Sequence, residues 1–204
     1  MSLFELRRTA TTPRRSQVSS ASVSMSLFEL RRTDHPTPEV ERAAIVADPV
    51  FGKFYADHMA VADYTEGLGW HDARIIPTGQ WQLHPAAAVF HYGQEIFEGL
   101  KAYRHADSSV WLFRPEKNAR RFISSAERLE MAPLPEDLFL AALDELVALE
   151  QAWVPQPDGE RSLYLRPFEI ADEPYLGVRE AKNYRYGLLA SPVGAYYPAP
   201  VKLW

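Results

Sequence analysis

A tyrosine and an arginine two residues apart, Tyr164 and Arg166, are the residues of this 204-residue chain whose types and spacing most clearly indicate a binding site. They lie in the segment SLYLRP, which predicts a short β-strand whose alternate residues point to opposite faces. Leu163 and Leu165 then share a face suited to a core, and Tyr164 and Arg166 share the other. Because a guanidinium grips a carboxylate with two parallel hydrogen bonds, this face predicts a seat for a small carboxylate. Pro167 is expected to end this strand. An ordinary edge strand with a solvated arginine stays open as the plainer interpretation.

The composition limits the classes to which the chain can belong. Hydrophobic and aromatic fractions of 47% and 12% indicate a globular protein with a core, as one large domain or two small ones. No run of about 18 apolar residues occurs, so no membrane span is expected. The absence of cysteine excludes disulfides and thiolate sites and suits a cytosolic enzyme. The net charge of −5 argues against nucleic-acid binding. No metal site is predicted, because ligand spacing beside a carboxylate is lacking at His58, His71, His84 and His91.

The N-terminal segment contains a duplication. Met1–Thr9 and Met25–Thr33 both read MSLFELRRT. Two copies across a Ser/Thr/Arg-rich spacer cannot form a solenoid, so a local duplication, or translation that starts at Met25, explains them. The Arg- and Ser-rich, acid-poor composition also resembles an organellar transit peptide. The default expectation is a disordered tail over residues 1–45, with residues 34–48 leading into the fold.

Hydrophobic patterning predicts an α+β domain over residues 46–192, with a mixed or antiparallel sheet and two main helices. The helices follow Pro115 and Pro135, where apolar residues recur at spacings of three and four. Besides the segment at 162–167, strands are expected near residues 59–64, 81–83, 86–92, 102–103, 110–113 and 185–191.

Four segments, in this order and spacing, resemble the N-terminal half of a branched-chain-amino-acid aminotransferase. They read FHYGQEIFEGLKAY, LFRPEKNARRFISSAERL, LYLRPFEIADEPYLGV and SPVGAYY. The resemblance runs from about Phe51 to Trp204 and implies the small domain of a fold-type IV enzyme that uses pyridoxal 5′-phosphate, without the second domain. It also implies that residues 193–204 begin an interdomain link. D-amino-acid aminotransferase and aminodeoxychorismate lyase share this architecture, but LYLRP and GQEIFEG favour the branched-chain enzyme. A non-catalytic dimerising fragment stays open as a function of a different class.

The resemblance implies roles for eight residues. Arg121 would hold the cofactor phosphate, and Tyr164 and Arg166 would lie near the substrate carboxylate. Val178, like one of the aromatic residues, Tyr92, would reach the neighbouring subunit's site in a homodimer. The aromatic residues implied to line the pocket for a leucine, isoleucine or valine side chain are Phe51, Tyr92, Phe97 and Tyr196.

The implied reaction is ping-pong transamination between these amino acids and 2-oxoglutarate, in cytoplasmic amino-acid biosynthesis. It needs a lysine in a Gly-rich segment of the second domain. No such context surrounds any lysine of this chain, namely Lys53, Lys101, Lys117, Lys182 and Lys202. No catalytic residue is therefore assigned, and these 204 residues alone are expected to be inactive. The sequence leaves open whether the end at Trp204 is natural, which substrate is preferred, and whether the role is biosynthetic or catabolic.

Overall fold

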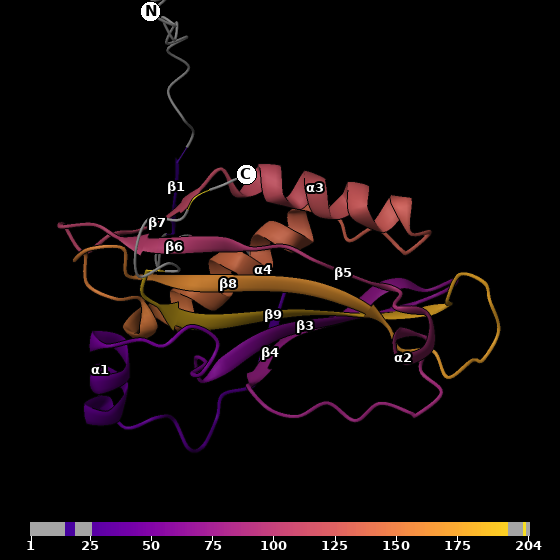
Figure 1. The fold of residues 1–204 in the computed structure, drawn as a ribbon, viewed down its shortest axis with the longest axis horizontal. Coiled ribbons are helices and arrows are strands. Elements are labelled where there is room, and N and C mark those ends of the chain that lie inside the picture. Colours follow the sequence, from indigo (N-terminus) through magenta and orange to yellow (C-terminus); the bar gives the residue numbers. More distant parts are fainter. Residues whose placement is uncertain (1–14, 19–25, 196–201, 203–204) are drawn as a thin grey trace, which may run out of the picture.

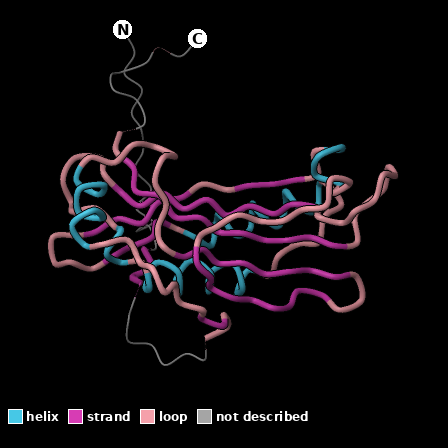
Figure 2. The backbone as a smooth tube through the Cα atoms, turned by 90° about the horizontal axis from the view of Figure 1, so that it is seen from below, coloured by secondary structure: helices cyan, strands magenta, loops and turns pink. Residues whose placement is uncertain are grey.

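One mixed sheet organises the molecule (Figure 1). The computed structural model describes residues 15–18, 26–195 and 202, and its nine strands follow the order β1-β7-β6-β8-β9-β3-β4-β2, with β5 also paired to β8. The strands are β1 Arg15–Val18, β2 Glu29–Leu30, β3 His58–Thr65, β4 Gly69–Pro77, β5 Glu95–Phe97, β6 Leu100–Arg104, β7 Val110–Phe113, β8 Ser162–Ala171 and β9 Asn183–Val193. All neighbours pair antiparallel except β2 and β4, which are parallel. Figure 2 shows the strands running side by side along the molecule, with loops at both ends.

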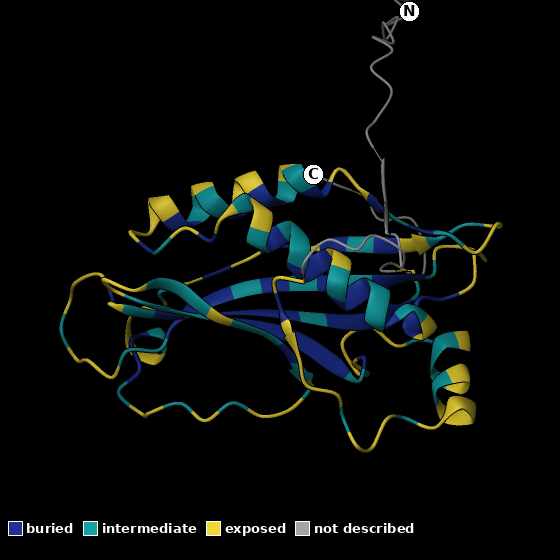
Figure 3. Ribbon diagram, turned by 180° about the vertical axis from the view of Figure 1, so that it is seen from behind, coloured by how far each residue is buried: buried dark blue, intermediate teal, exposed yellow. Residues whose placement is uncertain are grey.

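Two long helices cover one face of this sheet. They are α3 (Pro115–Arg128) and α4 (Glu136–Leu149), and both begin where the proline positions predicted. Phe122 of α3 and Phe139 of α4 meet Tyr186 of β9, with ring centroids 5.9 and 6.4 Å apart. Figure 3 shows α4 crossing the sheet with its exposed residues turned outward. The α+β prediction is confirmed, and this interface is the core of the domain.

The opposite face of the sheet carries the polar side of β8. Alternation along β8 turns Tyr164, Arg166 and Phe168 away from the buried Leu163 and Leu165. The connection after β4 crosses part of this face, and the Trp81 ring packs 5.2 Å from Phe168. A Cβ at Gly187 would lie 2.5 Å from the Phe168 ring, so close packing explains the glycine.

Three predicted elements differ from the structure. Residues 81–83 form no strand, and residues 86–92 form the short helix α2 (Ala88–Tyr92). The strand prediction at 86–92 is wrong because an alanine run suits a helix and Gly93, with φ 58°, ends it in a left-handed conformation. The expected end of β8 at Pro167 is also wrong, since the strand continues to Ala171.

The expected disordered tail differs from the structure at residues 15–18, which form β1, and at residues 26–45, and its other residues lie outside the described ones. Phe28 is buried in the core, β2 pairs with β4, and α1 (Glu39–Ala47) follows. A two-residue strand and a single buried aromatic are too short to give a periodic signal. No helix in the described ranges is long and apolar enough to cross a membrane.

Candidate functional site

Pro167 interrupts the sheet next to the predicted carboxylate-binding site at Tyr164 and Arg166. β5 and β6 keep one register with β8, in which Phe97 lies opposite Phe168 and Leu100 opposite Leu165. Glu98 therefore lies opposite Pro167, where its N–H donates to the Pro167 carbonyl oxygen at 2.9 Å. The returning hydrogen bond cannot form, because proline has no N–H. This explains why the pairing breaks into β5 and β6, and why Pro167 is tolerated inside β8.

The Arg166 side chain lies beside this break, and its terminal nitrogens have no hydrogen-bond partner among the described residues. Its Nε donates to the Tyr164 hydroxyl at 2.9 Å, and its Cζ lies 4.5 Å from the centroid of the Phe97 ring. The Phe51 ring packs 5.4 Å from Tyr164 on the same face. No carboxylate of the described ranges pairs with Arg166. A half-buried guanidinium without an acidic partner, edged by aromatic rings, can bind an external carboxylate.

Arg121 is held by a buried carboxylate on the other side of the same break. Its Nε and Nη2 donate to Glu98 at 2.5 and 2.8 Å, and Asn118 donates to Glu98 at 2.8 Å. The Glu98 side chain is 5% exposed and that of Arg121 is 67% exposed. Burial works to raise the pKa of Glu98, but the hydrogen bonds from Arg121 and Asn118 outweigh it, and the pKa lies below its ordinary value. Glu98 thus stays ionised and fixes the guanidinium, leaving Arg121 Nη1 without a protein partner among the described residues.

The two arginines approach the break from different sides. Glu98 shares the helix-covered face with Pro167, whereas Arg166 points to the open face. A depression beside the break contains neither arginine in its lining, which consists of Gly99, Leu100, Lys101, Tyr103, Phe113, Asn118 and Tyr164. Asn118 thus touches both the Glu98–Arg121 pair and the depression that holds Tyr164. The structure brings Phe51, Phe97, Tyr164 and Arg166 together. Arg121 lies apart from this group, on the Glu98 side of the break.

Gly99 allows the Tyr164 ring to take its place, and Gly99→Ala is expected to displace it. A Cβ at Gly99 would lie 2.6 Å from the Tyr164 hydroxyl oxygen. We expect a loss of about 1–3 kcal/mol in the free energy of unfolding, measured by urea denaturation, because overpacking forces the ring to move. Gly79→Ala is the control, since its Cβ would meet nothing nearer than 3.9 Å. Equal stability of the two variants would contradict this packing.

Two of the predicted residues lie elsewhere. Tyr92 and Val178 line a separate hollow with Gln94, Leu129 and Arg179. Val178 is 92% exposed, and within the described ranges no ring contact or hydrogen bond joins either residue to the Arg166 group. Tyr196 lies outside the described residues.

Glu98 and Asn118 are the functional candidates that sequence reasoning missed. Glu98 carries a readable signal, because a carboxylate between apolar strand residues needs a cation when it is buried. Asn118 carries none, since an asparagine in the first turns of a helix is ordinary there.

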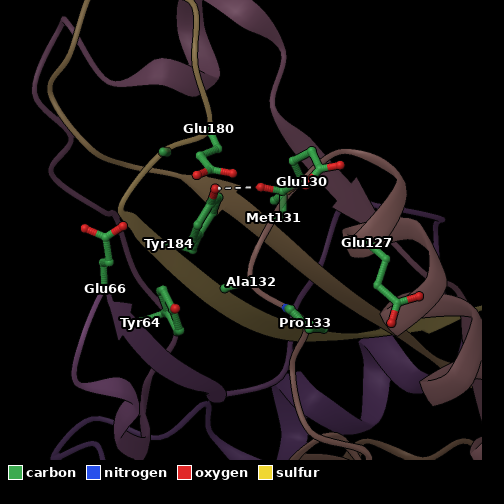
Figure 4. Close-up of a pocket in the computed structure, with 10 residues that line it drawn as sticks. Tyr64, Glu66, Glu127, Glu130, Met131, Ala132, Pro133, Glu180 and Tyr184 are labelled. Atoms are coloured by element: carbon green, nitrogen blue, oxygen red, sulfur yellow. Dashed lines mark hydrogen bonds between the residues drawn. The ribbon is translucent and has the colours of Figure 1, made fainter.

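A further hollow, lined by several glutamates, is unsuited to binding a carboxylate substrate. Figure 4 shows Tyr64, Tyr184 and four glutamates around it, with the Tyr184 hydroxyl donating to the Glu130 carbonyl oxygen at 3.2 Å. Burial, and then Glu169, raises the pKa of Tyr184 to about 12. These carboxylates would repel an acidic substrate. Among the residues that the structure describes, no group of three or more His, Cys, Asp or Glu side chains is placed to hold a metal ion.

The amino-acid sequence of this chain matches those of known proteins over most of its length. The branched-chain-amino-acid aminotransferase of Mycolicibacterium smegmatis is 54% identical over 180 residues, which cover 87% of this chain and 49% of that protein. The chain is a homologue of the branched-chain-amino-acid aminotransferases. The probable branched-chain-amino-acid aminotransferase of Streptomyces coelicolor is also 54% identical over 180 residues, which cover 87% of this chain and 50% of that protein. Branched-chain-amino-acid transaminase 1 of Bacillus subtilis is 53% identical over 147 residues, which cover 72% of this chain and 41% of that protein.

The chain spans about half the length of the curated branched-chain aminotransferases that it matches. No family model matches it. A solved branched-chain amino acid aminotransferase, complexed with N-(5′-phosphopyridoxyl)-L-glutamate, is 25% identical and covers 68% of this chain and 42% of that one. The TM-score between the two structures is 0.49. The sequence relatives confirm the resemblance predicted from the motifs.

Proposed function

We propose that this chain is part of a pyridoxal 5′-phosphate-dependent aminotransferase that moves an amino group between leucine, isoleucine or valine and 2-oxoglutarate. The observation that carries the proposal is the Arg166 guanidinium, which has no acidic partner in the described ranges and lies against the Phe97 ring. Both the amino acid and its 2-oxo acid bear a carboxylate that such an arginine can bind. The names of the relatives support branched-chain amino acids as substrates.

The residues present fit the cofactor's phosphate. Arg121 is exposed, permanently charged and fixed by Glu98, with one terminal nitrogen free of protein partners in the described part. When bound, the cofactor supplies an electron sink for the substrate α-carbon. In this proposal Arg121 holds the phosphate, Arg166 and Tyr164 orient the carboxylate, and no lysine of the chain is given a catalytic role. The 204 residues alone are therefore expected not to turn over.

Aromatic walls support tolerance of several branched side chains. Phe51 and Phe97 are 46% and 64% exposed beside Arg166 and Tyr164, and would contact the side chain of a bound amino acid. An apolar wall discriminates by only about 1–3 kcal/mol per methylene group, so all three amino acids are expected to be accepted.

The proposal includes a homodimer, because Tyr92 and Val178 are exposed together away from Arg166. Residues that line no site on their own chain can complete the site of a second copy. A cytoplasmic location and a role in branched-chain amino-acid biosynthesis are also proposed, on the resemblance alone.

The test uses a chimera of residues 1–204 with the C-terminal half of the M. smegmatis relative. Its kcat/KM is measured with L-leucine and 2-oxoglutarate. Arg166→Gln is expected to lower kcat/KM by about 100-fold, because a charged hydrogen-bonded contact to the substrate is lost. Arg120→Gln is the control, since Arg120 is exposed and pairs with Glu136.

Several outcomes would count against the proposal. Preference for D-amino acids would favour a D-amino-acid aminotransferase, and equal activity of Arg166→Gln and Arg120→Gln would remove Arg166 from the carboxylate site. Turnover by residues 1–204 without the added half would show that a lysine of this chain is catalytic.

A further inference from the structure

The duplicated N-terminal sequence is bound to the fold through its second copy. Ser26 Oγ and the Leu27 N–H donate to the two oxygens of Glu145 on α4, at 2.5 and 2.9 Å. Phe28 is 3% exposed and belongs to the core cluster. The carboxylate thus fixes the start of the segment, and the aromatic ring anchors it.

The remaining residues of this copy pair with the sheet edge. Leu30 lies opposite Ile75 in the parallel pairing of β2 with β4, and the Arg31 N–H donates to the Ile75 carbonyl oxygen at 2.8 Å. The Thr33 N–H donates to Nε2 of His58 at 2.9 Å. The segment therefore covers an edge that would otherwise expose unpaired backbone groups. We call the surface that binds Ser26–Thr33 the arm site.

The same eight residues, SLFELRRT, occur again at Ser2–Thr9. Every side chain that the arm site contacts is thus supplied a second time, 24 residues earlier. We propose that the arm site binds either copy within one chain, so that the N-terminal arm exists in two registers. When Ser2–Thr9 is bound, residues 10–33 form a loop between Thr9 and Asp34.

The surroundings of Asp34 permit this loop. Asp34 and His35 are exposed, so a loop that closes there enters solvent rather than the core. Closing 24 residues disfavours the first-copy register by about a hundredfold, because loop entropy scales with the logarithm of length. The shift also removes β1, which pairs with β7 at the opposite end of the sheet order. The second copy is therefore the major occupant, and weakening it is expected to bring in the first.

The test places a thiol pair in a chain that has no cysteine. Glu145→Cys is combined with Ser26→Cys to report the second-copy register, and with Ser2→Cys to report the first. A short bifunctional thiol crosslinker is applied to the full chain, and crosslinked peptides are measured by mass spectrometry. Since Glu145 serves both registers, its replacement weakens both alike.

Phe28→Asp is expected to raise the intramolecular crosslink between positions 2 and 145 at least tenfold. Adding Phe4→Asp is expected to abolish that gain, because neither copy then anchors an aromatic ring. Phe4→Asp alone is expected to leave the crosslink between positions 26 and 145 unchanged, which shows that the chain still folds.

Two results would overturn the proposal. One is an equal yield of the crosslink between positions 2 and 145 in Phe28→Asp and in Phe28→Asp/Phe4→Asp. Chance proximity of the N-terminal residues, without binding to the arm site, would give that result. The other is a crosslink found only between two chains, which would indicate exchange between molecules.

Discussion

Glu169→Leu is expected to stabilise the protein at pH 7 by about 3 kcal/mol. Glu169 lies on the core face of β8, is fully buried, and neither of its carboxylate oxygens has a hydrogen-bond partner among the described residues. Burial raises its pKa to about 9 from an ordinary value of 4.5. Folding thus requires the carboxyl group to keep a proton that the unfolded chain releases at neutral pH, and leucine removes this cost.

The raised pKa of Glu169 also predicts how the free energy of unfolding changes with pH. Since the folded pKa of Glu169 is raised, its contribution is most favourable below pH 4.5 and is lost as the pH rises toward 9, by about 1.4 kcal/mol per pH unit. Urea denaturation across this range should show the slope in the parent chain and a flatter profile in Glu169→Leu. Glu95→Leu, an exposed replacement on the adjacent β5, is the control. An unchanged slope would mean that Glu169 titrates normally.

His58→Ala is expected to destabilise the protein by about 3–5 kcal/mol. Nδ1 of His58 contacts Glu150 at the end of α4, and both side chains are buried. Burial raises the pKa of Glu150, while the contact with His58 opposes that rise. Removing the imidazole leaves Glu150 buried without this partner and also takes the acceptor from the Thr33 N–H. Guanidinium denaturation followed by tryptophan fluorescence measures the loss.

The double variant His58→Leu/Glu150→Leu separates pairing from packing. Replacing both polar partners of a buried pair by apolar groups costs less than removing one. The double variant is therefore expected to be more stable than His58→Leu alone. Additive losses would instead show that the two side chains contribute independently.

The sequence predicted what depends on periodicity. The shared face of Tyr164 and Arg166 follows from alternation in a strand, and α3 and α4 follow from apolar spacing and the prolines before them. A β5–β6 interruption opposite Pro167 could not be predicted, because it depends on which strand lies beside β8 rather than on any local pattern.

The role of Glu98 was hidden for the same reason. Its partner Arg121 is 23 residues away on another element, and only tertiary packing brings the two together. The resemblance supplied Arg121 without the carboxylate that fixes it. Docking of Ser26–Thr33 was likewise out of reach, since eight residues bound by Glu145, His58 and the β4 edge carry no periodic signal of their own.

The missing N–H of Pro167 has a consequence for how this surface can diversify. Because one absent donor opens the ladder, the spacing between the Arg166 side and the Glu98 side is set by the main chain. Of the side chains around it, Phe51 packs against the Tyr164 ring, and its exchange would leave the backbone that carries both arginines in place. The backbone would thus fix the positions of the substrate carboxylate and the cofactor phosphate, while the surrounding side chains would determine which substrate side chain is accepted.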